Sequence, residues 1–140
     1  LREGEDLLII AIGSTVYPSL EAAALLEKQG INIGVLDGRF IKPLDEQLIT
    51  DKMRQYKRII TVEEQVLAGG FGSAILELAN KKELYDLQIR RLGLPDLFIE
   101  HGSQTKMRNI YKIDSHGIAE KVMEFLSGKV EVAQWPRKNA

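Results

Sequence analysis

Residues 7–12 form an unbroken apolar run, Leu-Leu-Ile-Ile-Ala-Ile. The run has the length of a strand, and an apolar side chain at every position is typical of a strand that is buried on both faces. A sheet that contains such a strand must be covered on both faces, and helices are the usual cover. The run therefore predicts an α/β domain with a largely parallel sheet between two layers of helices.

Three further apolar segments have the length of strands, and they lie at residues 31–36, 58–62 and 87–92. The last segment carries a glutamine and two arginines, so we expect it to lie at an edge of the sheet. Helical patterns separate the four segments, which predicts parallel strands joined by right-handed crossovers.

The predicted helices begin at recognisable positions. Ser14 or Thr15 can cap the first helix, and Gly70 precedes the third. Asp45 and Asp114 can cap the second and the fourth helix. The side chains that we expect on the buried faces of the four helices are Leu20, Ala23, Ala24, Leu25 and Leu26; Leu48, Ile49 and Met53; Phe71, Ile75 and Leu78; and Ile118, Val122, Phe125 and Leu126.

Composition excludes several classes of protein. The chain has 140 residues, 44% of them hydrophobic and 28% charged, which fits one soluble globular domain. Its net charge of -1 gives no sign of a surface for nucleic acid or for acidic membranes. Cysteine is absent, so disulfides, thiolate metal ligands and a cysteine nucleophile are excluded. No apolar run approaches the ~20 residues of a membrane helix.

The third predicted helix opens on a glycine-rich segment that contains Gly69, Gly70, Gly72 and Ser73. Free backbone N–H groups and the positive end of the helix dipole meet at such a place, which suits an anion. The spacing matches neither of the glycine-rich nucleotide signatures. We therefore favour a structural interpretation, in which the glycines let the helix approach neighbouring backbone closely.

Glu63 and Glu64 stand at the end of the third predicted strand. Ligands of open α/β sheets bind at that edge, so either carboxylate is a candidate general base. Neighbouring side chains on a strand point to opposite faces, which prevents the two from acting as one pair. We favour a buried contact of a glutamate with a helix end or with a neighbouring domain.

Four charged residues surround the turn at Pro43, namely Asp37, Arg39, Lys42 and Asp45. Apart from the helix cap at Asp45, the pair of Asp37 and Arg39 can orient the loop through a charge-assisted hydrogen bond. The alternative is phosphate binding by Arg39 and Lys42, and we favour the structural interpretation.

His101 lies in a long irregular segment, residues 93–112. With Asp96 and Ser103 it suggests a catalytic triad, but these residues are too close in sequence to indicate that geometry. A metal site has little support, because the chain has two histidines and no ligand pattern near them. We interpret the segment as a functional loop or an interface, and we expect the second histidine, His116, to be exposed.

Three stretches of the chain resemble one family. Residues 35–45 (VLDGRFIKPLD), 61–74 and 93–103 (GLPDLFIEHGS) are similar, in this order, to the transketolase C-terminal domain of 1-deoxy-D-xylulose 5-phosphate synthases. The middle stretch is shared with 2-oxoacid dehydrogenase β chains. The third stretch, together with residues 114–118, is the most specific. Gly38 departs from the family pattern, which has a larger residue before the arginine.

The resemblance implies a three-layer αβα sandwich around a mixed, mostly parallel five-stranded sheet. It makes residues 7–12 the antiparallel strand, next to an edge. The family domain would cover residues 1–127, and residues 128–140, which include Trp135, would be a flexible tail.

The resemblance also implies a function. Synthases of this family join pyruvate to glyceraldehyde 3-phosphate with loss of carbon dioxide, using thiamine diphosphate and magnesium, and their product feeds isoprenoid and thiamine biosynthesis. The cofactors belong to the preceding domains, so the resemblance assigns this chain no catalytic, cofactor-binding or metal-binding residue and implies that the chain alone is inactive. It implies a cytoplasmic homodimer in which this domain packs against the thiamine-binding domains of the same chain. The candidates for that interface, or for an anion site, are Arg39, Glu63, Glu64, Gly69, Gly70, Gly72, Ser73 and His101.

Two alternatives remain open at this point. The chain resembles, more weakly, the C-terminal domains of transketolases and of 2-oxoacid dehydrogenase β chains, against which residues 93–103 argue. The other alternative is a stand-alone regulatory module that binds an anion at its glycine-rich edge.

Overall fold

The computed structural model describes residues 1–95 and 104–128. In this part of the chain four strands form one sheet in the order β2-β1-β3-β4, and every pair of neighbours is parallel. The strands are β1 (Leu7–Ala11), β2 (Ile33–Asp37), β3 (Arg58–Val66) and β4 (Gln88–Leu94). The four strand positions predicted from apolar runs are confirmed, as is the edge position of the last one.

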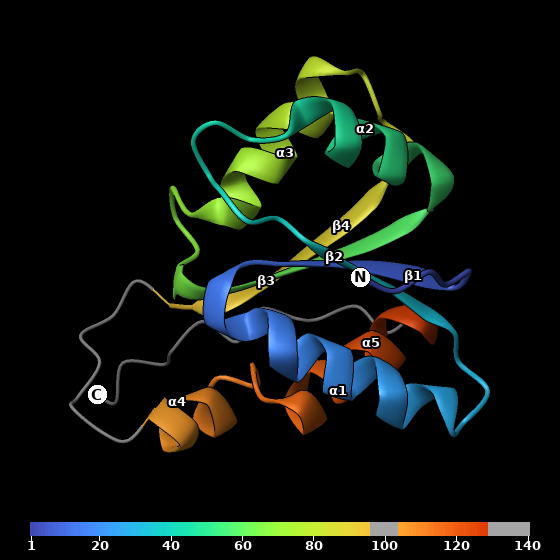
Figure 1. Cartoon of the computed structure of the whole chain (residues 1–140), viewed down its shortest axis with the longest axis vertical. Coiled ribbons are helices and arrows are strands. Elements are labelled where there is room, and N and C mark those ends of the chain that lie inside the picture. The colour runs from blue at the N-terminus through green and yellow to red at the C-terminus, as the bar shows by residue number, and fades with distance from the viewer. Residues whose placement is uncertain (96–103, 129–140) are drawn as a thin grey trace, which may run out of the picture.

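Helices cover both faces of the sheet, so the three-layer αβα arrangement is confirmed (Figure 1). One face carries α2 and α3, and the other carries α1 and α5. The helices are α1 (Val16–Glu27, preceded by the short 3-10 helix η1, Gly13–Thr15), α2 (Glu46–Gln55), α3 (Phe71–Lys81), α4 (Gln104–Ile110) and α5 (Ser115–Leu126). Within the described residues no helix is long and apolar enough to cross a membrane.

The five-stranded mixed sheet implied by the resemblance is wrong in detail for the described residues. β1 lies next to the edge strand β2, as expected, but it is parallel to both of its neighbours. A helix joins each pair of consecutive strands and returns the chain to the same end of the sheet, which makes the strands parallel. Antiparallel pairing occurs instead at Arg2, whose N–H donates to Val35 O at 3.1 Å and whose carbonyl accepts from Val35 N–H at 2.9 Å.

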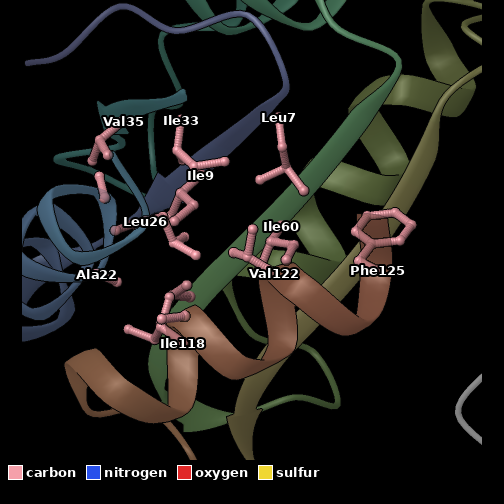
Figure 2. Packing of buried hydrophobic residues seen from close by; sticks show 14 of the residues in the cluster. Leu7, Ile9, Ala22, Leu26, Ile33, Val35, Ile60, Ile118, Val122 and Phe125 are labelled. Atoms are coloured by element: carbon pink, nitrogen blue, oxygen red, sulfur yellow. The ribbon is translucent and has the colours of Figure 1, made fainter. Parts of the chain in front are cut away.

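The core has two halves, one on each face of the sheet. Leu7 and Ile9 of β1 point towards α1 and α5, where Figure 2 shows them facing the side chains of both helices. Leu8 and Ile10 point the other way and pack under α2 and α3. All four are buried, which explains the unbroken apolar run: each face of this strand borders a separate layer of helices.

The caps and buried faces of the helices follow the sequence with a few exceptions. Asp45 accepts the N–H of Leu48 at 3.1 Å, and Asp114 accepts the N–H of Gly117 at 2.9 Å, so these two predicted caps are confirmed. The cap predicted at Ser14 or Thr15 is wrong, because Thr15 precedes α1 but its hydroxyl donates to Val62 O instead of capping the helix. Leu48 and Ala24 were expected to face inward and are exposed. The sequence patterns also missed α4, which has no buried residue and hence no apolar periodicity to reveal it.

Candidate functional site

Glu63 is fully buried at the carboxyl edge of the sheet, beside the first turn of α3. Its Oε2 accepts the N–H of Phe71 at 2.7 Å, and its Oε1 accepts the N–H of Gly72 at 2.9 Å. Both oxygens therefore satisfy backbone donors that a helix start leaves without intrahelical partners. Of the two contacts that we favoured for a glutamate at this edge, with a helix end or with a neighbouring domain, Glu63 makes the first.

The glycines at this edge allow backbone and side chains to come very close. A Cβ atom on Gly70 would lie 2.6 Å from Val66 O and closer still to the Glu63 carboxylate. A Cβ atom on Gly72 would lie 2.6 Å from Thr61 Oγ1. Gly69 has a φ of 71°, in the left-handed region. These approaches are what the structural interpretation of the glycine-rich segment requires.

Ser73 helps to hold the loop between β3 and α3 in place. Its hydroxyl donates to Leu67 O at 2.9 Å and accepts from Arg91 Nη1 at 3.0 Å. The same Arg91 nitrogen donates to Leu67 O at 3.1 Å. Ser73 is thus bound by groups of the same chain. The negative charge at the start of α3 is the carboxylate of Glu63.

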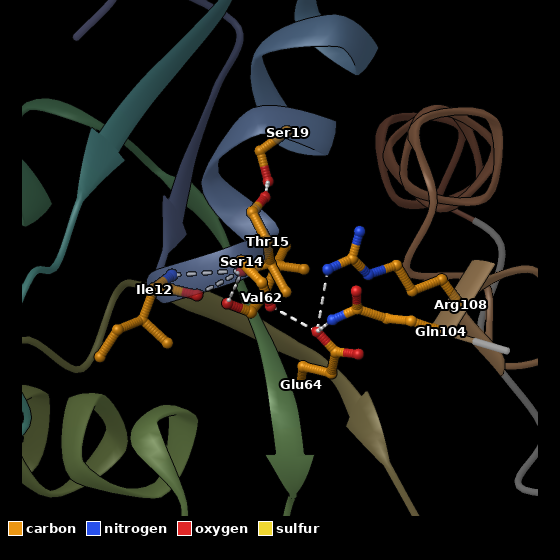
Figure 3. Close-up of polar contacts among 8 residues, drawn as sticks. All are labelled: Ile12, Ser14, Thr15, Ser19, Val62, Glu64, Gln104 and Arg108. Atoms are coloured by element: carbon orange, nitrogen blue, oxygen red, sulfur yellow. Dashed lines mark hydrogen bonds and ion pairs between the residues drawn. The ribbon is translucent and has the colours of Figure 1, made fainter. Parts of the chain in front are cut away.

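Glu64 lies on the opposite side of β3 and collects donors from distant parts of the chain (Figure 3). Its Oε2 accepts hydrogen bonds from the Ser14 hydroxyl, from Gln104 Nε2 at 3.1 Å and from Arg108 Nη2 at 3.1 Å. These contacts fasten α4 and the start of η1 to the end of β3. Burial by itself would raise the pKa of Glu64, but the hydrogen bonds from Ser14, Arg108 and Gln104 outweigh it, and the pKa lies below its ordinary value.

The hydrogen bonds to Glu64 predict how the stability of the chain depends on pH. A depressed carboxyl pKa contributes stability that is complete above the ordinary value of 4.5 and is lost as the pH falls through the lower folded value. We expect Glu64→Gln to lower the free energy of unfolding by about 1 kcal/mol at pH 7, because the variant loses the charge that Arg108 faces. Urea unfolding between pH 7 and pH 3 should show this difference shrinking below about pH 4.5.

Glu77→Gln is the matched control for that experiment, because Glu77 is an exposed glutamate on α3. This control should follow the wild-type chain at every pH. A difference between Glu64→Gln and wild type that stays constant down to pH 3 would show that the charge of Glu64 has no part in it.

The loop after β2 follows the structural interpretation. Asp37 Oδ1 accepts the N–H of Arg39 at 2.9 Å, and Arg39 Nε lies 4.0 Å from Asp37 Oδ2. Arg39 has a φ of 49°, and its side chain is 76% exposed. Lys42 is exposed as well. Among the candidates that the structure describes, Arg39 is thus the one whose charged group is most exposed.

The other candidate residues lie apart from this edge or outside the described residues. His101, Asp96 and Ser103 fall in the part of the chain that the structure does not describe. His116 is exposed, as expected. The described ranges contain no group of three His, Cys, Asp or Glu side chains that could hold a metal ion.

The start of α3 does not fit the diphosphate of thiamine diphosphate. The helix end that would attract a diphosphate already holds the Glu63 carboxylate, so the two negative groups would repel each other at that site. Glu64, the other carboxylate of this edge, is bound to Arg108. The residues of this edge are thus engaged with one another.

Sequence reasoning missed the partners of Glu64. Ser14, Gln104 and Arg108 are 50, 40 and 44 residues away from it along the chain. No local pattern connects such residues, and α4 itself gave no periodic signal.

Comparison with known proteins places the chain among enzymes that are much longer. The family model for "Transketolase, C-terminal domain" matches residues 1–118. Relatives include the 1-deoxy-D-xylulose-5-phosphate synthase of Halothermothrix orenii, 50% identical over 140 residues, and that of Aquifex aeolicus, 44% identical over 128 residues. These matches cover 100% and 91% of the chain, but only 22% and 20% of the two relatives.

Solved structures give the same fold. A split-gene transketolase, described as an inactive β4 tetramer, matches 90% of the chain and 41% of its own length with a TM-score of 0.81 and 30% identity. A transketolase of Pichia stipitis in complex with sedoheptulose 7-phosphate matches 91% of the chain and 17% of its own length. Its TM-score is 0.63 at 19% identity, which shows the fold alone.

Proposed function

Since this chain belongs to the transketolase C-terminal domain family, we propose that it is the C-terminal structural and assembly domain of a 1-deoxy-D-xylulose 5-phosphate synthase. The observation that carries the proposal is the 50% identity to such a synthase over all 140 residues. The chain spans about a fifth of the length of its synthase relatives, so the activity belongs to a larger protein.

The proposed reaction joins pyruvate to glyceraldehyde 3-phosphate with loss of carbon dioxide. Thiamine diphosphate, held with magnesium by the preceding domains, would supply the carbanion chemistry. The part of this chain is to complete and hold the assembly, as a homodimer in the cytoplasm. This role agrees with the way in which the carboxylates of its sheet edge are bound by its own backbone and side chains.

A stand-alone anion-binding module is the second candidate, and the geometry gives it less support. The helix end that would bind the anion faces a buried carboxylate of the same chain. Isothermal titration of the chain with phosphate or nucleotides measures this directly. We expect no heat of binding up to millimolar ligand.

If the preceding domains hold the cofactors and this chain only completes the assembly, the two proteins should differ in enzymatic activity. We expect the full-length protein to form 1-deoxy-D-xylulose 5-phosphate from pyruvate and glyceraldehyde 3-phosphate when thiamine diphosphate and magnesium are present. The 140-residue chain should form none under the same conditions, because the proposal assigns the cofactors to the preceding domains. Product formation by the chain alone would refute the assembly role, and an inactive full-length protein would refute the assignment to the synthases.

The proposed interface includes the candidates Arg39, Glu64, Gly69, Gly70, Ser73 and His101, whereas Glu63 and Gly72 are buried and support this edge from within the domain. Among the described members, Arg39 tests the interface best, because its exposed guanidinium contributes little to the fold of this chain. Arg39→Ala should weaken dimerisation or lower the melting temperature of the full-length protein while the 140-residue chain unfolds as before. No change in dimerisation, stability or activity would remove this residue from the interface.

A further inference from the structure

Phe40 is a large apolar side chain that a well-fixed loop holds in solvent. Its side chain is 66% exposed. The loop before it is tied to the sheet, because Gly38 N–H donates to Ala11 O at 2.8 Å and Asp37 accepts the N–H of Arg39. A single exposed ring is common on protein surfaces, and it marks a contact with another surface only where further exposed apolar side chains adjoin it.

The loop is also packed tightly against the start of α3. A Cβ atom on Gly38 would lie 2.8 Å from Cε2 of the buried Phe71, so a larger residue here would require the ring to shift. The N–H of Phe71 is in turn bound by Glu63. The loop that carries Phe40 therefore rests on the buried edge behind it.

Phe40 borders a surface hollow of about 500 Å³ that other exposed apolar side chains share. Leu48, on α2, is 42% exposed and lines this hollow, and so does Leu1, which is 70% exposed. Asp37, Arg39 and Asp45 stand around them. An apolar centre within a charged rim is the usual anatomy of a protein interface.

We propose that this hollow is the surface on which the preceding part of the polypeptide docks in the full-length protein, an inference that rests on the proposed function. Leu1 lines the hollow, and the neighbouring Arg2 is fixed beside it by two backbone hydrogen bonds with Val35. A chain that continues upstream of Leu1 must leave from this place. About four-fifths of the length of the synthase relatives lies outside the matched region, which supplies ample chain to cover it.

The proposed contact is mainly apolar, with the ring of Phe40 as its anchor. The occupant should therefore present aliphatic or aromatic side chains to Phe40 and Leu48. The buried carboxylate edge around Glu63 then acts as the support that positions this loop, and the exposed Arg39 belongs to the rim.

The test compares Phe40→Glu with Tyr85→Glu in the full-length protein. Tyr85 is 73% exposed, lies between α3 and β4, and does not line the hollow, so it controls for adding a charge to the surface. We expect Phe40→Glu to speed proteolysis just upstream of residue 1 by roughly tenfold, because undocking exposes that junction. In the 140-residue chain both variants should unfold at the wild-type temperature, which shows that the domain itself is intact.

The possible outcomes separate the hypotheses. Proteolysis of Phe40→Glu at the rate of Tyr85→Glu would overturn the inference. A loss of dimerisation with unchanged proteolysis would also overturn it, because the occupant would then be a second copy of the chain. Failure of the wild-type full-length protein to make the synthase product would refute the proposed function alone, since the proteolysis result does not depend on turnover.

Discussion

Glu63→Ala is expected to lower the free energy of unfolding of the 140-residue chain by about 4 kcal/mol, roughly 2 kcal/mol for each of the two buried helix-start donors that lose their partner. The N–H groups of Phe71 and Gly72 lose both of their acceptors in this variant, in a place that water does not reach. The loss is a large part of the ~5–15 kcal/mol that stabilises a domain of this size. Urea unfolding at pH 7, followed by circular dichroism, measures it.

Two variants control for this result. Glu63→Gln should lie between alanine and wild type, because its amide oxygen accepts one N–H while its NH₂ group opposes the other. Glu64→Ala should cost about 1 kcal/mol, since its partners are side chains near solvent that water can replace. Equal losses for the two neighbouring glutamates would contradict the distinct roles that the structure gives them.

Gly70→Ala should cost about 3 kcal/mol, because the new methyl group overlaps Val66 O and the Glu63 carboxylate. The backbone carbonyl cannot move without breaking the loop, and the carboxylate cannot move without leaving the N–H groups of α3. The variant therefore disrupts the same helix start as Glu63→Ala, but from the side of the backbone. Thermal unfolding of the purified chain measures the loss.

Gly69→Ala is the matched control for that variant. A Cβ atom on Gly69 would meet nothing within 4 Å, so its cost arises from the left-handed φ of 71° alone. We expect about 1 kcal/mol for this conformational strain. A larger loss for Gly69→Ala than for Gly70→Ala would mean that backbone conformation, rather than close approach, explains the glycines of this edge.

The parts of the fold that depend on short-range physics were predictable from the sequence. The run at residues 7–12 identifies a doubly buried strand because both faces of β1 contact helices. Asp45 and Asp114 identify helix starts because a cap bonds to an N–H three residues away. A contact with a helix end was one of the two contacts expected for Glu63 or Glu64, because both stand near the end of a strand and precede a glycine-rich helix start.

The parts that depend on distant contacts were not predictable in the same way. Arg108 meets Glu64 across 44 residues, and nothing in the sequence around either residue marks the pair. Leu48 was placed inside because apolar residues on a helix favour burial, yet it lies on the surface in the hollow beside Phe40. The direction of β1 was taken from the resemblance and was wrong, whereas the strand–helix alternation gave it correctly.

The buried carboxylate at α3 has one more consequence. A helix start surrounded by glycines is a receptor for anions, and here its ligand is tethered to the receptor by eight residues of chain. A tethered ligand acts at an effective concentration in the millimolar range or above, so a free anion competes with it poorly. The Glu63 carboxylate therefore occupies this helix end in the folded domain. We expect free phosphate and sugar phosphates not to bind there unless Glu63 is first displaced.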